Sequence, residues 1–434
     1  MKYFHCFKAI LAILLFSCGA HYSHGSHNQW TKWSIDSRGN GADGVHTADI
    51  NRDGFIDVVS GWEQSGDIFL YLNPGRGRLT TTAPWPRIDI SGGLEIEGIE
   101  DAAFADLDLD GYADAVISSI EGETKTIGLH WSTGLAADDL THWQAVVLTP
   151  NQSDGYMKAR AGQIDGSGGA DIVAGTKRMD GHNAGIYWFK LPDRTQPDIA
   201  QEWQRFFVGE IDVKTVTLAI ANMDSDGLED IVYSGRNGVG WFKNPGHEIL
   251  QDTPELANWE RIVIADTGSE FTFCDPTGGG SQDLIIATSK KSAMVAKWLK
   301  RLDGTGRHWQ EYPIASDDER PGKISGKKFV LKGVACGFVD GDERIDVVFS
   351  ASGDGHGIFM MSPRADIASG KPWELTHITL HAKGMKYDNL ELVDMDRDGD
   401  LDIVTTEEGE GVFSSGDGVL WLENPLHKAQ EVDN

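Results

Sequence analysis

The sequence predicts an all-β fold, a seven-bladed β-propeller, and three observations point to it. An acidic loop recurs along the chain, a tryptophan introduces a strand-like stretch between successive copies, and 52 of the 434 residues are glycine. That glycine content is well above the usual share of roughly 7% and is typical of short strands joined by tight turns. The repeat, rather than the chain length, indicates the domain organisation.

The acidic loop has the pattern Asp-x-Asp-x-Asp-Gly-x-x-Asp, as in residues 106–114. Four full copies and three eroded copies start 53 to 63 residues apart. Each copy runs into an apolar, β-branched segment, which predicts a strand. The first positions of the seven copies are Asp49, Asp106, Gln163, Asn222, Asp275, Phe338 and Asp394.

Two further strands follow from other landmarks. Seven tryptophans open short alternating stretches, and the third strand of several units ends with an aromatic residue and a proline, as in residues 241–245. Units of about four short strands at a fixed period predict a propeller. The Trp30 strand precedes the first loop and nothing similar follows Pro425, so we expect it to complete the seventh blade and close the ring. The tryptophans are Trp30, Trp85, Trp143, Trp203, Trp259, Trp309 and Trp373.

These repeats resemble the FG-GAP or VCBS repeat family, whose members include the propellers of integrin alpha chains. The resemblance covers about residues 29 to 426. It implies a propeller fold and loops that are presented to extracellular proteins or glycans.

The chemistry of the acidic loops points to Ca²⁺. Side-chain oxygens at positions 1, 3, 5 and 9, with a glycine that permits a sharp turn, surround one point with hard ligands. We expect each ion to neutralise crowded carboxylates and to stabilise a turn, without a part in catalysis. The predicted ligands are Asp49, Asn51, Asp53, Asp57, Asp106, Asp108, Asp110, Asp114, Asn222, Asp224, Asp226, Asp230, Asp394, Asp396, Asp398 and Asp402.

The eroded loops are expected to bind calcium weakly or not at all. Phe338 removes one ligand, and Gln163 and Ser167 dilute the charge of another loop. An alternative remains for every copy, because aspartate side chains also accept hydrogen bonds from the N–H groups of a turn without any metal.

A specific function must come from residues that differ between blades. The strand before each acidic loop is expected to be the innermost one, so we aligned the residues five and three places before position 1. Both columns mix small with ionisable residues, which predicts a polar site in the central channel. Candidate catalytic residues are His46, Asp101, Tyr156 and Tyr387, and candidate ligand-binding residues are Lys158, Arg160, Lys214, Glu270 and Glu391.

Three hypotheses explain these residues. They could pair with one another as a polar plug around trapped water. They could bind an acidic glycan or a protein, which is the favoured hypothesis. They could also form a polysaccharide lyase or dehydratase for uronic-acid sugars, in which Lys158 and Arg160 hold the carboxylate and His46 or a tyrosine transfers the proton.

The composition excludes some partners. The net charge of −29 argues against a nucleic acid or an anionic lipid surface. A hydrophobic content of 40%, with 14 tryptophans and 17 phenylalanines, is sufficient for an extensive core. We expect a folded monomer rather than a disordered acidic chain.

The first residues predict an export signal. Lys2 and Lys8 lead into the apolar run 9–16, which is too short to span a bilayer. Either Cys18 is the lipidated residue of a lipoprotein, or an ordinary signal peptidase cleaves nearby. No transmembrane segment is predicted, so the protein would be secreted, periplasmic or lipid-anchored at the cell surface. The predicted divisions are a signal peptide at 1–20, a flexible linker at 21–28, the propeller at 29–428 and a tail at 429–434.

Two cysteines, Cys274 and Cys336, remain outside this leader. They lie on neighbouring innermost strands, so a disulfide between them is one alternative. Two separate buried thiols are the expected arrangement.

Overall fold

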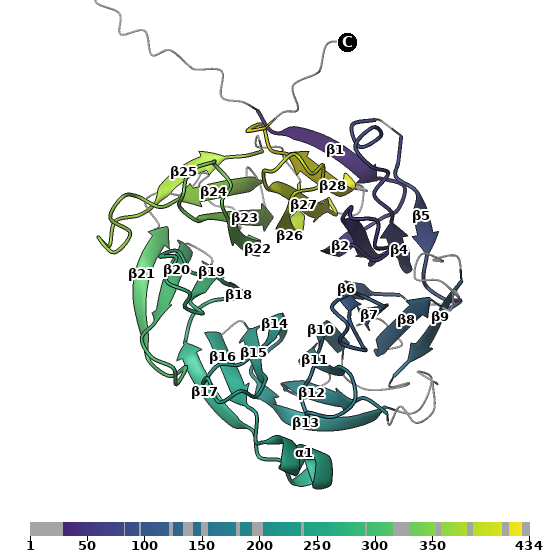
Figure 1. Ribbon diagram of the computed structural model, residues 1–434, viewed down its shortest axis with the longest axis vertical. Helices are drawn as coiled ribbons and strands as arrows, with labels where there is room; N and C mark the ends of the chain where they lie inside the picture. Colours follow the sequence, from purple (N-terminus) through teal and green to yellow (C-terminus); the bar gives the residue numbers. More distant parts are fainter. Residues whose placement is uncertain are drawn as a thin grey trace, which may run out of the picture.

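Seven four-stranded antiparallel sheets stand around a common axis in this computed structural model, and together they form a closed ring (Figure 1). The sheets are the blades of a β-propeller, as predicted. The structure describes residues 29–81, 83–94, 97–120, 125–132, 142–148, 155–178, 183–192, 203–235, 238–290, 293–315, 330–352, 357–379, 385–409 and 416–427. The predicted signal peptide, with Cys18, and the linker lie outside the described residues.

Each blade runs from an innermost strand near the axis to an outermost strand at the rim (Figure 1). Blade 1 comprises β2 (Ala42–Ala48), β3 (Asp57–Trp62), β4 (Asp67–Tyr71) and β5 (Arg87–Asp89). Blade 2 comprises β6 (Ile99–Ala105), β7 (Ala115–Ile120), β8 (Ile127–Ser132) and β9 (Trp143–Val147). Blade 3 comprises β10 (Gly155–Gly162), β11 (Asp171–Lys177), β12 (Ala184–Lys190) and β13 (Gln204–Ile211).

The remaining blades follow in the same order. Blade 4 comprises β14 (Thr215–Ala221), β15 (Asp230–Gly235), β16 (Gly238–Lys243) and β17 (Glu260–Ala265). Blade 5 comprises β18 (Glu270–Phe273), β19 (Leu284–Lys290), β20 (Ala293–Arg301) and β21 (Trp309–Ala315). Blade 6 comprises β22 (Val330–Gly337), β23 (Asp346–Ser352), β24 (Ile358–Ser362) and β25 (Glu374–His377). Blade 7 comprises β26 (Tyr387–Val393), β27 (Asp402–Glu407), β28 (Gly418–Glu423) and β1 (Thr31–Asp36).

The two ends of the described chain meet in blade 7. Strand β1 pairs antiparallel with β28, and Trp33 lies opposite Trp421. The prediction that the strand after Trp30 completes the last blade is therefore confirmed. Pairing the first strand with the last blade leaves no open gap in the ring, so no pair of sheet edges is exposed there.

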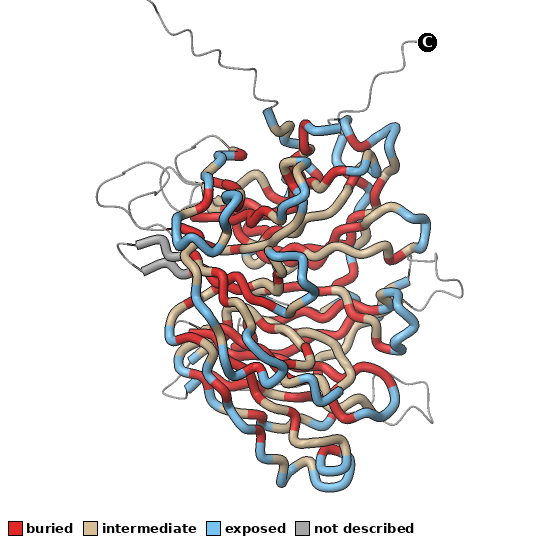
Figure 2. The backbone as a smooth tube through the Cα atoms, turned by 60° about the vertical axis from the view of Figure 1, so that its left-hand side comes forward, coloured by how far each residue is buried: buried red, intermediate tan, exposed pale blue. Residues whose placement is uncertain are grey.

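Neighbouring blades pack face to face, and the hydrophobic core lies between them, as the buried segments in Figure 2 show. Trp298 of blade 5, for example, belongs to one cluster with Phe349 of blade 6, and both side chains are almost fully buried. Trp188, Trp241 and Trp421 occupy the third strands of their blades and have no exposed surface. Burying a large apolar side chain contributes about 2–3 kcal/mol, so these contacts set the packing of the ring.

A disulfide bond joins Cys274, just after β18, to Cys336 of β22. The expectation of two separate thiols was therefore wrong. Their Cα atoms are 6.3 Å apart, because the innermost strands of blades 5 and 6 converge towards the axis. The bond links two adjacent blades covalently.

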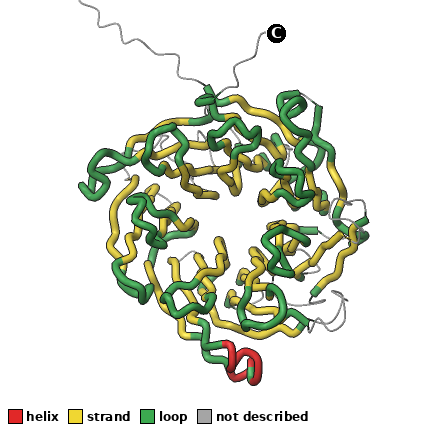
Figure 3. Tube along the Cα trace, viewed as in Figure 1, coloured by secondary structure: helices red, strands yellow, loops and turns green. Residues whose placement is uncertain are grey.

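Position 1 of each acidic loop follows an innermost strand, and position 9 begins the next strand or directly precedes it, so all seven loops lie at the same end of the ring. We call this end the loop face and the other end the opposite face. The one α-helix among the described residues, α1 (His247–Asp252), lies at the rim beside blade 4, while loops cover the faces (Figure 3). No helix in the described part of the chain is long and apolar enough to cross a membrane.

Candidate functional site

The seven acidic loops share one backbone turn. In the four full copies the fourth residue is left-handed, with φ between 59° and 63°, and the sixth is a glycine with φ between 85° and 101°. A left-handed residue other than glycine costs about 1–2 kcal/mol. Hydrogen bonds offset this, because the amides of Asp53 and Gly54 donate to the two carboxylate oxygens of Asp49 at 3.0 and 2.9 Å. The left-handed fourth residues are Arg52, Leu109, Ser225 and Arg397, and the eroded copies have Gly166, Gly278 and Gly341 instead.

The aspartate at position 9 is only partly satisfied by hydrogen bonds in blade 1, whereas both oxygens of Asp230 and of Asp402 accept hydrogen bonds. In blade 1, Asp57 is fully buried, and its Oδ1 accepts a hydrogen bond from the Asn73 amide at 2.8 Å, whereas its Oδ2 has no partner. Burial, together with Asp53 and Asp49, raises the pKa of Asp57 to about 7. A buried carboxylate oxygen beside further carboxylates fits a bound cation.

Blades 2 and 7 gather carboxylates most closely. Each set has three ligand atoms within 4.8 Å of one another. All the donors are oxygens, so the chemistry of the set fits Ca²⁺ rather than a softer metal. The ion would neutralise the loop and contribute to folding stability. The two sets are Asp106, Asp108 and Asp110 in blade 2, and Asp394, Asp396 and Asp402 in blade 7.

Lysines occupy the corresponding place in blades 3 and 4. The ammonium group of Lys243 contacts the carboxylates of both Asp224 and Asp226, the latter at 2.7 Å. In blade 3, Lys190 at the equivalent strand position lies 2.8 Å from Asp165. A lysine charge therefore already neutralises these two loops, and calcium in blade 4 would have to displace Lys243. The sequence prediction of ligands in blade 4 did not take this lysine into account.

Charged side chains from four consecutive blades meet on the innermost strands around the axis of the ring. Asp101 of β6 is fully buried and lies 2.8 Å from Arg160, 3.2 Å from His46 and 3.4 Å from Lys158. The other ring nitrogen of His46, Nδ1, is 2.8 Å from Glu391 of blade 7. These five residues, which we call the channel network, come together as the alignment of the innermost strands predicted.

Charged groups within the channel network shift the pKa values of their neighbours. Burial alone would raise the pKa of Asp101, but Lys158, Arg160 and His46 hold it well below its ordinary value. Burial and Arg160 lower the pKa of His46, yet Asp101 and Glu391 outweigh them and raise it. Nε2 of His46 also lies 3.3 Å from Arg160, so both ring nitrogens contact charged groups, and the acidic and basic groups of the network largely neutralise one another.

A second charged group lies at the opposite face, where the innermost strands begin. Lys332 pairs with Asp388 at 2.9 Å, and Lys386 pairs with Glu408. Asp43 and Glu63 place carboxylate oxygens within 4.8 Å of Glu408. We call the whole group the mouth cluster. It consists of Asp43, Glu63, Glu100, Lys158, Lys214, Glu270, Lys332, Lys386, Asp388 and Glu408.

Two members of the mouth cluster have shifted pKa values. Burial raises the pKa of Glu270 to about 8, so this side chain is mostly protonated at neutral pH, and its Oε2 accepts a hydrogen bond from Thr217 at 2.9 Å. Burial, with the nearby positive charge of Lys332, lowers the pKa of Lys214. Lys214 forms no ion pair with any residue that the structure describes.

Sequence reasoning missed part of this cluster because of a β-bulge. In six of the seven innermost strands the pairing register shifts near the start of the strand, as between Asp43 and Val45. A bulge interrupts the alternation of side chains, so Asp43, Lys332 and Asp388, six places before position 1, join the residues five places before it. Aligning that column would have found Asp43 and would have added Lys332 and Asp388, which the sequence places beside the two aligned columns, to the candidate set.

The two candidate tyrosines lie elsewhere. Tyr156 is fully buried between blades 2 and 3, where Arg205 donates a hydrogen bond to its hydroxyl at 3.0 Å. Tyr387 is buried in the cluster between blades 6 and 7, and its hydroxyl contacts the sulfur of Met385. The structure does not bring either ring into the channel network. The equivalent residues Ile99 and Leu331 are also core residues, a pattern that the sequence already contains.

Together, the ring and its acidic turns define a seven-bladed propeller with a repeated acidic loop. The chain carries an FG-GAP-like repeat, whose profile matches residues 49–117, from the first acidic loop to the strand after the second. A comparison with curated protein sequences finds no match.

Among solved structures, the fold is similar to BBS1N, crystallised in complex with ARL6DN and soaked with mercury. The identity is 11% and the TM-score 0.51, over 92% of this chain and 98% of that chain. The Dos1 propeller matches with 8% identity and a TM-score of 0.47, over 91% and 95% of the two chains. The Nup133 β-propeller domain of Vanderwaltozyma polyspora matches with 9% identity and a TM-score of 0.46, over 85% and 90%. Identities this low indicate a common fold only.

Proposed function

We propose that the protein is an exported, calcium-stabilised propeller that binds an acidic extracellular glycan at the mouth cluster. The observation that carries this proposal is Lys214, an ammonium group without an ion pair among the described residues, beside the protonated carboxyl of Glu270 and the second ammonium of Lys332.

The chemistry of these groups suits a carboxylate or a sulfate. The Lys214 ammonium can form a charge-assisted hydrogen bond to an anionic oxygen. Glu270, while it keeps its proton, can donate a second hydrogen bond instead of repelling the ligand. An anion at this point would also relieve the repulsion between Lys214 and Lys332 that lowers the pKa of Lys214. A uronic-acid or sulfated sugar provides such an anion.

Calcium and export are parts of the same proposal. The unpartnered Oδ2 of Asp57 and the close carboxylates of blades 2 and 7 support bound calcium in blades 1, 2 and 7. The Cys274–Cys336 disulfide supports an oxidising compartment outside the cytoplasm, where such bonds persist.

Binding is favoured over β-elimination by the contacts of His46 in the channel network. Elimination needs a base that removes a proton next to the uronate carboxyl group. His46 Nε2 lies 3.2 Å from Asp101 and 3.3 Å from Arg160, and Nδ1 lies 2.8 Å from Glu391, so both ring nitrogens already contact charged groups of the protein. These contacts support a binding module over an elimination catalyst.

The experiment compares Lys214→Met with a matched control, Lys371→Met, which changes an exposed lysine on a rim loop. Titration calorimetry with an oligogalacturonide and with a sulfated oligosaccharide should show binding by the wild type and at least a tenfold weaker affinity for Lys214→Met. Lys371→Met should bind like the wild type.

The proposal fails if the wild type binds neither oligosaccharide, or if Lys214→Met binds as tightly as the wild type. Growth of the ultraviolet absorbance of new C=C bonds during incubation would show elimination instead. Binding of an extracellular protein without any oligosaccharide binding would point to a protein partner.

A further inference from the structure

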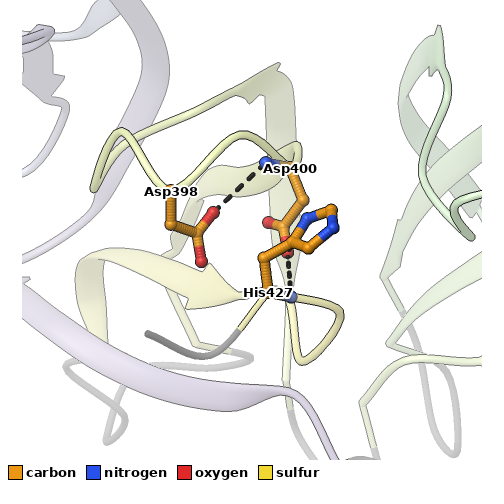
Figure 4. Close-up of side chains that lie close together, drawn as sticks. All are labelled: Asp398, Asp400 and His427. Atoms are coloured by element: carbon orange, nitrogen blue, oxygen red, sulfur yellow. Dashed lines mark hydrogen bonds and ion pairs between the residues drawn. The ribbon is translucent and has the colours of Figure 1, made fainter. Parts of the chain in front are cut away.

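At the acidic loop of blade 7, two side chains that are not among the predicted calcium ligands, Asp400 and His427, form a cluster with Asp398. Asp398 and Asp400 of the loop and His427, in the turn after β28, offer ligand atoms within 4.8 Å of one another. Figure 4 shows the two carboxylates and the imidazole ring facing a common point. Two backbone hydrogen bonds hold the arrangement, because the Asp400 amide donates to Asp398 at 3.1 Å and the His427 amide donates to Asp400 Oδ2 at 2.8 Å.

The second carboxylate oxygen of Asp400, Oδ1, gives an independent reason to expect a ligand here. The Asp400 side chain is only 2% exposed, and its Oδ1 has no hydrogen-bond partner. Leaving a buried carboxylate oxygen unsatisfied is unfavourable by about 1–3 kcal/mol. In Figure 4 this carboxylate lies between Asp398 and the ring of His427. The unsatisfied oxygen therefore belongs to the cluster and not to a distant hydrogen bond.

No lysine or arginine in the described part of the chain pairs with these two carboxylates. Within the described part of the chain, Asp400 forms one ion pair, with His427, whose Nδ1 lies 3.7 Å from Asp400 Oδ2. This contrasts with blade 4, where Lys243 contacts two loop aspartates. Apart from the imidazole of His427, no basic side chain among the described residues compensates the charge of these two aspartates.

We infer that Asp398, Asp400 and His427 form a second metal site, which shares Asp398 with the predicted calcium ligands of this loop, for a divalent transition metal such as Zn²⁺. Carboxylate oxygens alone suit Ca²⁺, but an imidazole nitrogen added to two carboxylates suits Zn²⁺ and similar ions. Asp398 has two oxygens and can lend one to each ion. His427 follows the last strand of the ring, so the metal ties the C-terminal turn to the blade that closes the propeller.

Zinc titration of the calcium-saturated protein tests this site. The wild type, His427→Ala and Asp400→Asn are compared by titration calorimetry with Zn²⁺ in excess Ca²⁺. The matched control is His308→Ala, because His308 is also exposed and pairs with a single aspartate, Asp303, at 2.7 Å. Asp400→Asn keeps an oxygen that can accept the His427 amide, and His427 is mostly exposed, so both variants should remain folded.

The wild type and His308→Ala should bind one more Zn²⁺ than His427→Ala, or bind it at least tenfold more tightly. Asp400→Asn should show the same loss. The histidines near the N-terminus, His21, His24 and His27, are present in every variant and cancel in the difference. Equal Zn²⁺ binding by the wild type and His427→Ala would overturn the inference. A loss of Ca²⁺ binding in His427→Ala that is as large as its loss of Zn²⁺ binding would also overturn the inference, because the histidine would then belong to the calcium-type loop.

Discussion

The buried carboxyl of Glu270 makes the stability of the protein depend on pH in a way that one substitution should remove. In the folded protein burial raises its pKa from the ordinary value of 4.5 to about 8. Between these values the unfolded chain releases the proton while the folded protein keeps it. The folded state therefore becomes relatively less stable as pH rises from 4.5 to 8, and the difference levels off above that.

The magnitude follows from the pKa difference. Each pH unit in this interval lowers the free energy of unfolding by about 1.4 kcal/mol, so Glu270 lowers it by about 3 kcal/mol at pH 7. Glu270→Gln cannot ionise, and its amide oxygen can still accept the hydrogen bond from Thr217. We therefore expect the variant to match the wild type at pH 4.5 and to exceed its stability by about 3 kcal/mol at pH 7.

Urea unfolding of the wild type and Glu270→Gln at pH values from 4.5 to 8.5 measures this difference. Glu311→Gln is the control, because Glu311 is half-exposed and pairs with Lys297 at the rim. It should leave the pH dependence unchanged. A stability difference between Glu270→Gln and the wild type that is the same at every pH would refute the argument.

Three further predictions concern the bond between blades, the acidic loops and the channel network. Replacing Cys274 and Cys336 by alanine opens a loop with a sequence separation of 62 and should lower the free energy of unfolding by about 4 kcal/mol, measured by urea unfolding. Lys243→Met should strengthen Ca²⁺ binding in blade 4 by at least tenfold, measured by calorimetric titration, because the competing ammonium is removed; unchanged binding would contradict the competition. Asp101→Asn should lower the pKa of His46 in an NMR titration and destabilise the protein by about 3–5 kcal/mol, since it leaves buried cations uncompensated; an unchanged pKa of His46 would contradict the channel network.

The ring and its closure were predictable because the sequence repeats them. The acidic loop occurs once per blade, and even the eroded copies keep the left-handed fourth position, for which Gly166 and Gly278 need no strain. The position of the first strand in blade 7 was predictable because a tryptophan strand precedes the first acidic loop and nothing similar follows Pro425. The joining of His46, Asp101 and Arg160 followed from the same periodicity, because the residues five and three places before position 1 lie on innermost strands that stand side by side around the axis.

Other features depend on contacts that a repeat does not encode. The bulges bring Asp43 and Asp388 into the mouth cluster, and strict alternation along a strand does not predict a bulge. Lys243 reaches the loop of blade 4 from the third strand, so its role depends on side-chain reach and not on the loop pattern. The Cys274–Cys336 bond depends on the distance between two innermost strands, which only the assembled ring determines.

The account depends most on calcium in the loops of blades 1, 2 and 7, since these ions would neutralise the carboxylates that surround Asp57 and Asp402. The most direct measurement is thermal unfolding of the protein with excess Ca²⁺ and with the chelator EGTA. We predict that the chelator lowers the melting temperature by roughly 10 °C, because each ion at a hundredfold excess over its dissociation constant adds about 2.7 kcal/mol. The same melting temperature in both conditions would contradict the assignment of calcium to these loops.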